Sequence, residues 1–215
     1  MLEVLADATI PPTIDSLASS LGVHRSIAYR ILRTLEDHGL VTRNADGAVQ
    51  LAPRMATLAQ NVSRDLQTAT LPVITQVAND LGMTTFLAVL DRSQVVTLVS
   101  VEPNHAHASI AQRPGTRHEL SVGAPGIAIQ SVMSQTQIRS LGQQFRPEAL
   151  EVALRGFATS HDEVIPGLTC VAVPLKLKGQ PPATIAVVYI ATVEPVEALG
   201  SRLNLAAKQI TEDLQ

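Results

Sequence analysis

The sequence predicts an α+β protein with two domains, and three observations support this prediction. First, the chain has 215 residues, whereas one domain commonly has about 100 to 200. Second, hydrophobic residues make up 46% and charged residues 16% of the chain, which is typical of well-packed globular cores. Third, apolar residues follow a helical period in the N-terminal part, and at Thr84 this period gives way to short segments typical of strands. A helical head is therefore followed by a domain that contains a sheet.

Two short helices joined by a tight turn are expected near the N-terminus. Thr13 can cap a helix that begins at Ile14, has apolar residues three and four positions apart, and stops at Gly22. A second helix begins at residue 24 or 25. Its apolar residues, which we expect to pack inward, are Ile27, Ala28, Ile31, Leu32 and Leu35.

The opposite face of the second helix is rich in groups that bind DNA. It carries three arginines, a hydroxyl and a phenol, namely Arg25, Ser26, Tyr29, Arg30 and Arg33. Arginine can contact phosphates or guanine edges, and hydroxyl groups can contact phosphates. Any pair of surface helices has a charged outer face, so this face could bind DNA or simply be exposed to water. The elements that follow this second helix in the sequence distinguish the two interpretations.

A hairpin is expected after Gly39, which ends the second helix. Residues 40–43 and 48–51 alternate in hydrophobicity around the turn residues 44–47. Arg43 would lie at the tip of this wing and contact a phosphate. Helix, glycine turn, basic helix and hairpin occur in the order of a winged helix-turn-helix. The sequence therefore predicts a head that binds double-stranded operator DNA.

The net charge of the chain, −3, does not oppose this prediction. Between residues 22 and 45 the arginines face only Glu36 and Asp37, so positive charge is local. Local fields govern docking, whereas the sum over the whole chain governs mainly solubility. A footprint this small binds weakly, so we expect a dimer whose recognition helices lie about 34 to 36 Å apart, one turn of the duplex.

No segment predicts a membrane span or a secretion signal. No run is long and apolar enough to cross a bilayer, and the N-terminus lacks a basic region followed by an apolar core. The single cysteine, Cys170, excludes an internal disulfide and fits the reducing cytosol. We therefore expect a cytoplasmic protein with no membrane partner.

A helical linker is expected between the two domains. Pro53 opens a helical stretch, and Pro72 restarts the helical pattern until Gly82 stops it. The apolar side of this stretch could form a dimer seam or pack on the neighbouring domain, and both interpretations stay open. That side consists of Met55, Leu58, Val62 and Leu66. The predicted boundaries are 1–52 for the DNA-binding domain, 53–70 for the linker and 71–215 for the second domain.

The second domain reads as strands, then helices, then strands and a last helix. Three strands are expected at 84–90, 95–101 and 106–112, followed by a stretch rich in glycine and proline. Helices begin near Gly126, Gln135 and Pro147, two more strands lie at 168–177 and 183–191, and a helix spans 195–214. This order predicts an antiparallel sheet with helices on one face, a common arrangement in ligand-sensing domains.

The whole chain resembles the IclR family of transcriptional regulators. Three segments carry the resemblance, SLASSLGVHRSIAYRILRTLEDHGLV, RPGTRHELSVGAPGIA and GFATSHDEVIPGLTCVAVPL. The resemblance implies a winged-helix head, a helical linker, a GAF-like effector-binding domain, and assembly as dimers or dimers of dimers. It implies a repressor or activator controlled by a small organic effector, an organic acid or a related catabolic metabolite. The first helix is short for the family, which leads us to expect a native start upstream of Met1.

The resemblance also implies an effector cavity in the second domain. Matched position by position, its lining corresponds to His107, Ile110, Ala124, Pro125, Ser160, Leu168, Cys170, Val187 and Tyr189. Free backbone N–H groups at the start of the helix near Gly126 would favour a carboxylate there. The sequence departs from the family pattern H-A-T-A-S-G-K-A, because Ser121 replaces the histidine and Ile127 the lysine. This loss favours a more apolar or differently held ligand.

Two other functions of the second domain are conceivable from its histidines and its cysteine. Cys170 could act as a nucleophile with His107 or His161 as base, but the sequence contains no nucleophile signature. His105 and His107 with Cys170 could bind zinc, but a carboxylate or second thiol at suitable spacing is missing. We therefore predict no catalytic residue, no metal and no cofactor.

Overall fold

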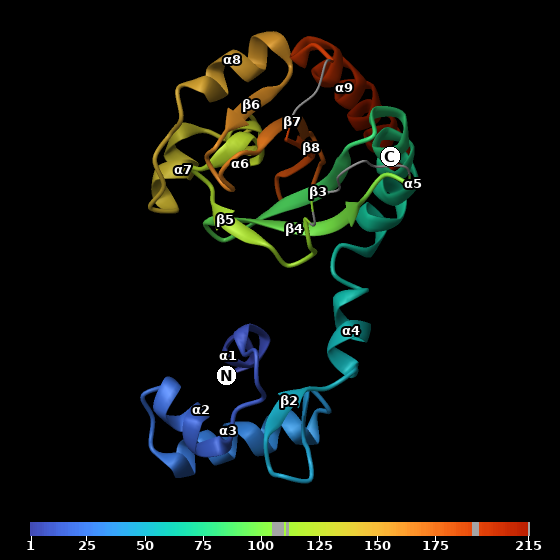
Figure 1. Ribbon diagram of the computed structural model, residues 1–215. Coiled ribbons are helices and arrows are strands. Elements are labelled where there is room, and N and C mark those ends of the chain that lie inside the picture. Colours follow the sequence, from blue (N-terminus) through green and yellow to red (C-terminus); the bar gives the residue numbers. More distant parts are fainter. Residues whose placement is uncertain (105–109, 111, 191–193, 215) are drawn as a thin grey trace. The chain divides into compact units, whose positions relative to one another are not determined.

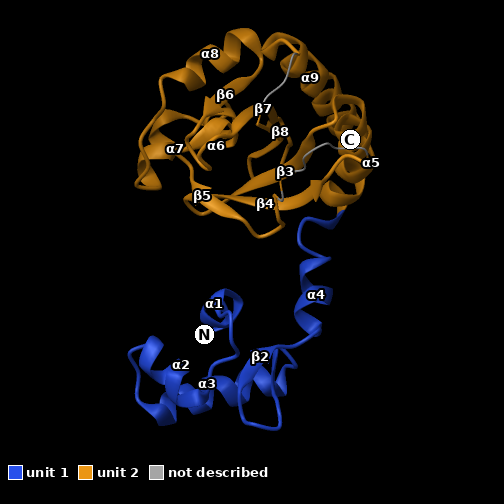
Figure 2. Cartoon of the chain, viewed as in Figure 1, with its two compact units in different colours: residues 1–64 blue, residues 65–215 orange. Residues whose placement is uncertain are grey.

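The structure is a computed structural model that describes residues 1–104, 110, 112–190 and 194–214 (Figure 1). The chain divides into two compact units, Met1–Arg64 and Asp65–Gln215, which are described separately (Figure 2). We call them the N-terminal unit and the C-terminal unit. Within the described residues, every helix is too short or too polar to cross a membrane.

The N-terminal unit is a winged helix-turn-helix. It contains α1 (Leu2–Asp7), α2 (Ile14–Ser20), α3 (Arg25–Asp37), β1 (Val41–Arg43), β2 (Val49–Leu51) and α4 (Arg54–Ala59). The strands of the wing are antiparallel, with Val41 opposite Leu51. The core of the unit is formed by Leu5, Leu17, Leu32, Val41 and Val49. This arrangement confirms the predicted order of elements.

The buried face of α3 is narrower than the sequence suggests. Ala28 and Leu32 are buried, and Leu35 packs against the core in part. Ile27 and Ile31 were expected to pack inward, but they are 47% and 39% exposed. Residues 28, 32 and 35 form one stripe at steps of four and three, whereas both isoleucines lie on its flank.

The break in the linker lies earlier than predicted. The α4 helix ends at Ala59, and Ser63 has a φ of +49°, in the left-handed region that ends helices. The next helix, α5 (Arg64–Leu81), then runs through Pro72 without a break. Proline inside a helix costs about 3 kcal/mol. Buried residues on both sides of it, such as Leu66 and Val77, stabilise the continuous helix.

A six-stranded antiparallel sheet forms the centre of the C-terminal unit. Its strand order is β5-β4-β3-β8-β7-β6. The strands are β3 (Thr84–Asp91), β4 (Gln94–Val101), β5 (Arg117–Glu119), β6 (Ala158–His161), β7 (Thr169–Leu175) and β8 (Ala183–Tyr189). The third strand of the meander was predicted at 106–112, but Arg117–Glu119 pairs with β4 instead. Most of 106–112 lies outside the described residues, and β6 was not predicted.

Helices cover both faces of this sheet, which corrects the expectation of one covered face. On one face α5 and α9 (Val196–Asp213) share a core with β7 and β8. On the other face α6 (Gly123–Gln130) packs on the same strands, with α8 (Glu148–Arg155) against it and α7 (Gln135–Ser140) nearby (Figure 1). Every residue of β8 is buried. A strand that is apolar throughout indicates burial on both faces.

Candidate nucleic-acid interface and ligand cavity

The turn between α2 and α3 fixes the start of the exposed helix. Thr13 accepts a hydrogen bond from the Ser16 backbone N–H at 3.4 Å, which caps α2. Gly22 has a φ of +63°, in the region that side chains rarely adopt. At the start of α3 the His24 ring accepts from the Ser26 backbone N–H at 3.3 Å. The first turn of α3 is therefore held in place by local contacts.

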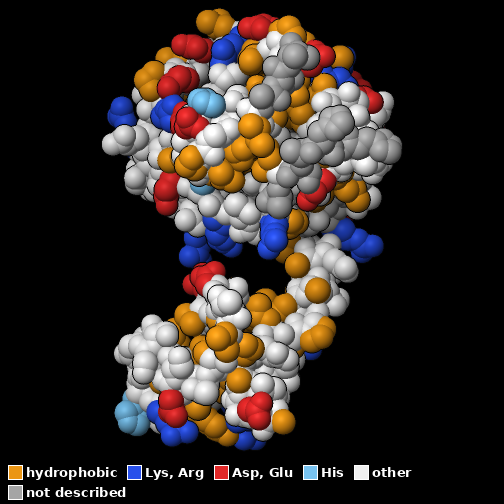
Figure 3. Space-filling view, in the orientation of Figure 1, with side chains coloured by type: hydrophobic (Ala, Val, Ile, Leu, Met, Phe, Trp, Pro, Cys, Tyr) orange, Lys and Arg blue, Asp and Glu red, His pale blue; other side chains and the backbone are white. Residues whose placement is uncertain are grey.

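The predicted DNA-contacting residues share the exposed side of the N-terminal unit. All five predicted residues on α3 are exposed, and basic side chains gather along the lower rim of this unit in Figure 3. A shallow open hollow on this side is lined by His24, Arg25, Ser26, Tyr29 and Arg30. Within the described part of the chain, Arg30 and Arg33 form no ion pair. Both guanidinium groups can therefore reach a phosphate or a base edge.

Two of the predicted cations are already paired with carboxylates. Arg25 lies 3.0 Å from Asp15 of α2. Arg43 of the wing donates two hydrogen bonds to Glu36, and its guanidinium lies 5.8 Å from the centre of the Tyr29 ring. The hydrogen bond with Glu36 raises the pKa of Arg43. Arg43 is thus bound to α3, and a DNA phosphate would have to compete with Glu36 for it.

A small cavity lies in the C-terminal unit on the α6 face of the sheet. Its lining comes from the strands, from the start of α6 and from the loop between β6 and β7. The lining residues are Phe86, Gln112, His118, Pro125, Ser160, Glu163, Val164, Ile165, Leu168, Cys170 and Val188. The space open to water is about 30 Å³, whereas about 10 to 15 Å³ is enough to hold one water molecule. A larger ligand would have to move some of these side chains.

Four of the predicted effector residues line this cavity, namely Pro125, Ser160, Leu168 and Cys170. Ala124 lies next to it, because its N–H donates to Ser160 Oγ at 2.8 Å. Ile110 packs against the same apolar cluster without being part of the lining. His107 lies outside the described residues.

The prediction that Val187 and Tyr189 line the cavity is wrong. Both side chains belong to the core on the opposite face of the sheet. Neighbouring side chains on a strand point to opposite faces, and Val188 lies opposite Cys170 in the sheet. Val188 therefore lines the cavity in their place. The alternation of side chains between the two faces of a strand is the signal that could have identified it.

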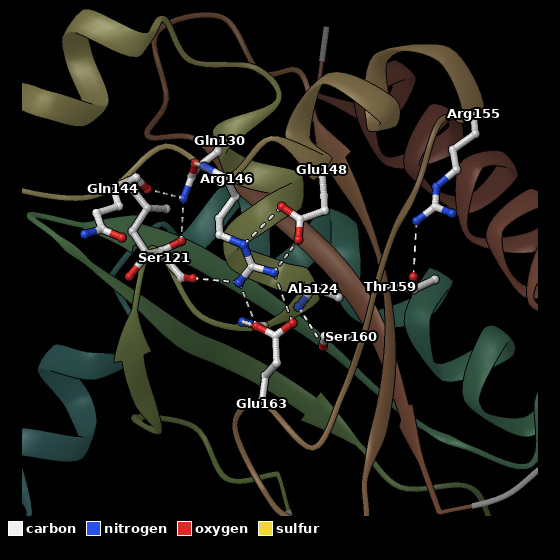
Figure 4. Close-up of polar contacts among 12 residues, drawn as sticks. Ser121, Ala124, Gln130, Gln144, Arg146, Glu148, Arg155, Thr159, Ser160 and Glu163 are labelled. Atoms are coloured by element: carbon white, nitrogen blue, oxygen red, sulfur yellow. Dashed lines mark hydrogen bonds and ion pairs between the residues drawn. The ribbon is translucent and has the colours of Figure 1, made fainter.

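The first two N–H groups of α6 already have acceptors within the chain. The Gly123 N–H donates to Glu163 Oε2 at 2.9 Å, and the Ala124 N–H donates to Ser160 Oγ at 2.8 Å. Pro125 has no N–H. Figure 4 shows Ser160 and Glu163 on the same side of this helix end. At Gly123 the place expected for a ligand carboxylate is therefore taken by the carboxylate of Glu163.

Arg146 holds the carboxylate of Glu163 in this position. Its Nη1 and Nη2 lie 2.8 and 3.2 Å from the two oxygens of Glu163. Nη2 also lies 2.8 Å from Glu148, and Nη1 donates to the Ser121 carbonyl at 2.9 Å (Figure 4). The hydrogen bond from Arg146 lowers the pKa of Glu163, so this side chain is charged at neutral pH. Sequence reasoning missed both residues because 17 positions separate them.

The remaining titratable groups of the cavity are neutral. Burial lowers the pKa of His118, whose Nδ1 lies 3.0 Å from the Glu119 carbonyl. Part of the Cys170 residue is exposed, but its thiol is buried, and burial raises its pKa to about 12. A thiol of this kind is a poor nucleophile at neutral pH. The described residues contain no group of three His, Cys, Asp or Glu side chains that could hold a metal ion.

Comparison with known proteins gives the same picture for both units. Residues 1–45 match the IclR helix-turn-helix domain, and residues 59–211 match the C-terminal domain of the bacterial transcriptional regulator IclR. The chain is 26% identical over 194 residues to the HTH-type transcriptional regulator XynR of Escherichia coli, covering 81% of this chain and 77% of that protein.

Two solved structures share the fold over nearly the whole chain. An IclR-type transcriptional regulator from Alicyclobacillus acidocaldarius has a TM-score of 0.85 and 24% identity, covering 100% of this chain and 95% of that one. An IclR homologue from Microbacterium hydrocarbonoxydans, complexed with 4-hydroxybenzoate, has a TM-score of 0.81 and 23% identity, covering 99% and 95%.

Proposed function

This chain belongs to the IclR family of bacterial transcriptional regulators, and we propose that its α3 helix reads operator DNA in the major groove. Membership of this family shows that the chain is a DNA-binding transcriptional regulator. The observation that carries the assignment of the reading face is that Arg30 and Arg33 on α3 are exposed and form no ion pair with any residue that the structure describes. Ser26 and Tyr29 would contact the backbone beside them, and Arg25 and Arg43 would contact phosphates after leaving their carboxylate partners.

The protein acts as a homodimer or a dimer of dimers in this proposal. A single reading helix offers a small footprint, whereas two heads can bind half-sites one duplex turn apart. The α4 helix has no buried residue, and its Leu58 is 48% exposed. Val62, which lies after the end of α4, is 51% exposed. Apolar side chains of this kind are typical of a surface that is covered in an assembly. The contact between copies would then lie along the linker.

The C-terminal unit senses a small organic effector in this proposal. The cavity at Ser160, Leu168 and Cys170 supports it, as does a fold shared with a protein that was crystallised with 4-hydroxybenzoate. An effector that binds one arrangement of the two heads more tightly shifts the population that can span both half-sites. Either sign of this linkage is possible, so the regulator is a repressor or an activator. We assign no catalytic role to Cys170, because its raised pKa opposes nucleophilic attack.

The reading face is tested by binding to duplexes selected from a random DNA library with the full chain. Arg30→Ala and Arg33→Ala should each weaken binding to the selected duplex by about 1 to 3 kcal/mol if the residue contacts a base. Arg139→Ala, at an exposed arginine of α7, is the matched control and should bind like the wild type. Unchanged binding in both α3 variants would refute the assignment of this face.

A further inference from the structure

Glu163 fills the polar end of the cavity with a negative charge. It lies on the loop between β6 and β7, and its side chain is 28% exposed. Its two oxygens accept hydrogen bonds from the Gly123 N–H and from both terminal nitrogens of Arg146. Val164 and Ile165, the next two residues, line the same cavity. The loop thus places a carboxylate and two apolar side chains at one site.

The groups that would attract a carboxylate ligand are already occupied. The N–H groups of Gly123 and Ala124 are used by Glu163 and Ser160. Arg146 binds two carboxylates, those of Glu148 and Glu163. The described lining of the cavity contains no lysine or arginine. A second carboxylate would therefore meet the negative charge of Glu163, and no lysine or arginine of the described lining could pair with it.

We propose that this cavity selects uncharged ligands, and that Glu163 is the residue that excludes carboxylates from it. This inference rests on the proposed function of the cavity as an effector site. It makes the effector a small, largely apolar molecule with a neutral polar group, rather than an organic acid. Glu163 acts as an internal ligand of the Gly123 N–H. Because Glu163 is part of the chain, its effective concentration at this N–H is high, and a free acid has to exceed that concentration to displace it.

The neutral polar groups of the lining indicate which ligand groups fit. Ser160 Oγ accepts from Ala124, so its hydroxyl hydrogen is available to a ligand acceptor. Gln112 uses Nε2 to donate to Thr97, so its oxygen is available to a ligand donor. His118 makes backbone hydrogen bonds with Glu119 and Val122, so its ring serves the chain itself. A hydroxyl, carbonyl or carboxamide group can be satisfied by this set.

The experiment compares matched neutral and anionic probes on the full chain by thermal unfolding. The probes are benzamide and benzoate, isobutyramide and isobutyrate, and acetamide and acetate, with sodium chloride at equal ionic strength as reference. The deciding quantity is the carboxylate concentration that gives half of the maximal stabilisation. In Glu163→Ala the site of the lost carboxylate is vacant, so this concentration should be at least about tenfold lower than in the wild type for one or more of the acids. The amides should show no such gain.

Two further variants keep the test decisive. Glu151→Ala removes an exposed carboxylate of α8 that has no partner among the described residues, and it should respond to acids like the wild type. If Glu163→Ala does not fold, Glu163→Gln replaces it, because a carboxamide oxygen can still accept from Gly123. The half-saturating acid concentration should then fall by at least about threefold, since only the charge is lost.

Specific outcomes would overturn the proposal. One is that an acid stabilises the wild type at a concentration as low as the one that stabilises the Glu163 variant. The other is that the half-saturating acid concentration falls in Glu163→Ala by less than about tenfold, or in Glu163→Gln by less than about threefold. Acid binding by a wild type that still binds its selected duplex would overturn charge selection and leave the proposed function standing. If the wild type showed no sequence-specific DNA binding, the proposed function would be overturned. The ratio of the half-saturating concentrations of acid and amide would still report the selectivity of the cavity.

Discussion

Arg43 in the wing and Glu36 in α3 form a two-point ion pair, with Nε 2.6 Å from Oε1 and Nη2 3.0 Å from Oε2. The pair ties the wing to α3, the helix that we propose reads DNA. It also places a negative charge on the side of the unit that we propose approaches DNA phosphates. Exposed ion pairs of this kind contribute little to stability, so we expect the main effect of this pair on DNA binding.

The first prediction is that Glu36→Gln strengthens DNA binding. The substitution removes a negative charge and frees Arg43 for a phosphate, so the slope of log K against log salt concentration should steepen by about 0.9. Fluorescence anisotropy with a labelled duplex between low and moderate salt measures this slope. Asp37→Asn is the control, because it makes the same change in net charge at a residue without an ion pair among the described residues. Equal slopes for the two variants would contradict the prediction.

Local signals explain why the head of the chain was predictable. Asn44 accepts hydrogen bonds from the N–H groups of Asp46 and Ala48 at 3.1 and 2.8 Å, and this turn is visible in the sequence as an Asn, Asp and Gly cluster. Caps and glycine stops are also local. The exposed Ile27 shows the limit, because its burial depends on what packs beside α3 and not on the helical period.

The errors in the C-terminal unit arise from contacts between distant residues. The short β5 strand has no period of its own and is defined by its pairing with β4. Coverage of both sheet faces depends on where α6 and α9 pack, which periodicity within one strand does not report. The contact between Gly123 and Glu163 joins residues 40 positions apart. Four cavity residues were found through the family resemblance, and the polar contacts around Arg146 were not.

The second prediction separates Val187 from Val188, neighbours on opposite faces of β8. Val188→Ile adds one methylene group beside the cavity and should change the free energy of unfolding by less than about 0.5 kcal/mol. Val187→Ile adds the same group to a fully buried core position and should destabilise the chain by about 1 to 3 kcal/mol. Urea unfolding followed by far-UV circular dichroism gives both values. Equal losses would mean that the cavity is absent in solution.

The third prediction concerns the dependence of stability on pH. Arg146 lowers the pKa of Glu163 and of Glu148 in the folded chain. A carboxylate with a lowered folded pKa stabilises the protein above its unfolded value of about 4.3, and this contribution is lost as the pH falls through the folded value. The wild type should therefore lose thermal stability below about pH 4.3 more steeply than Glu163→Gln. Melting curves between neutral and acidic pH test this, and parallel curves would exclude a contribution from the pair.

The fourth prediction is that Cys170 reacts slowly in the folded protein. Its pKa of about 12 leaves very little thiolate at neutral pH, so alkylation by iodoacetamide should be roughly a thousandfold slower than for an ordinary thiol with a pKa of about 8.5. At a pH far below the pKa of the thiol, the thiolate fraction rises about tenfold for each unit of pH. The alkylation rate should therefore rise by the same factor, with no plateau up to a pH of about 10.

The chain has only one cysteine, so the mass of the intact protein reports this reaction without ambiguity. The same protein in urea is the control, because unfolding exposes the thiol to water and restores an ordinary pKa. If the native chain were alkylated promptly at neutral pH, Cys170 would have to be an activated thiol and a catalytic role in the cavity would return. Slow reaction in the native chain and fast reaction in urea would instead place Cys170 among the apolar groups that enclose the ligand.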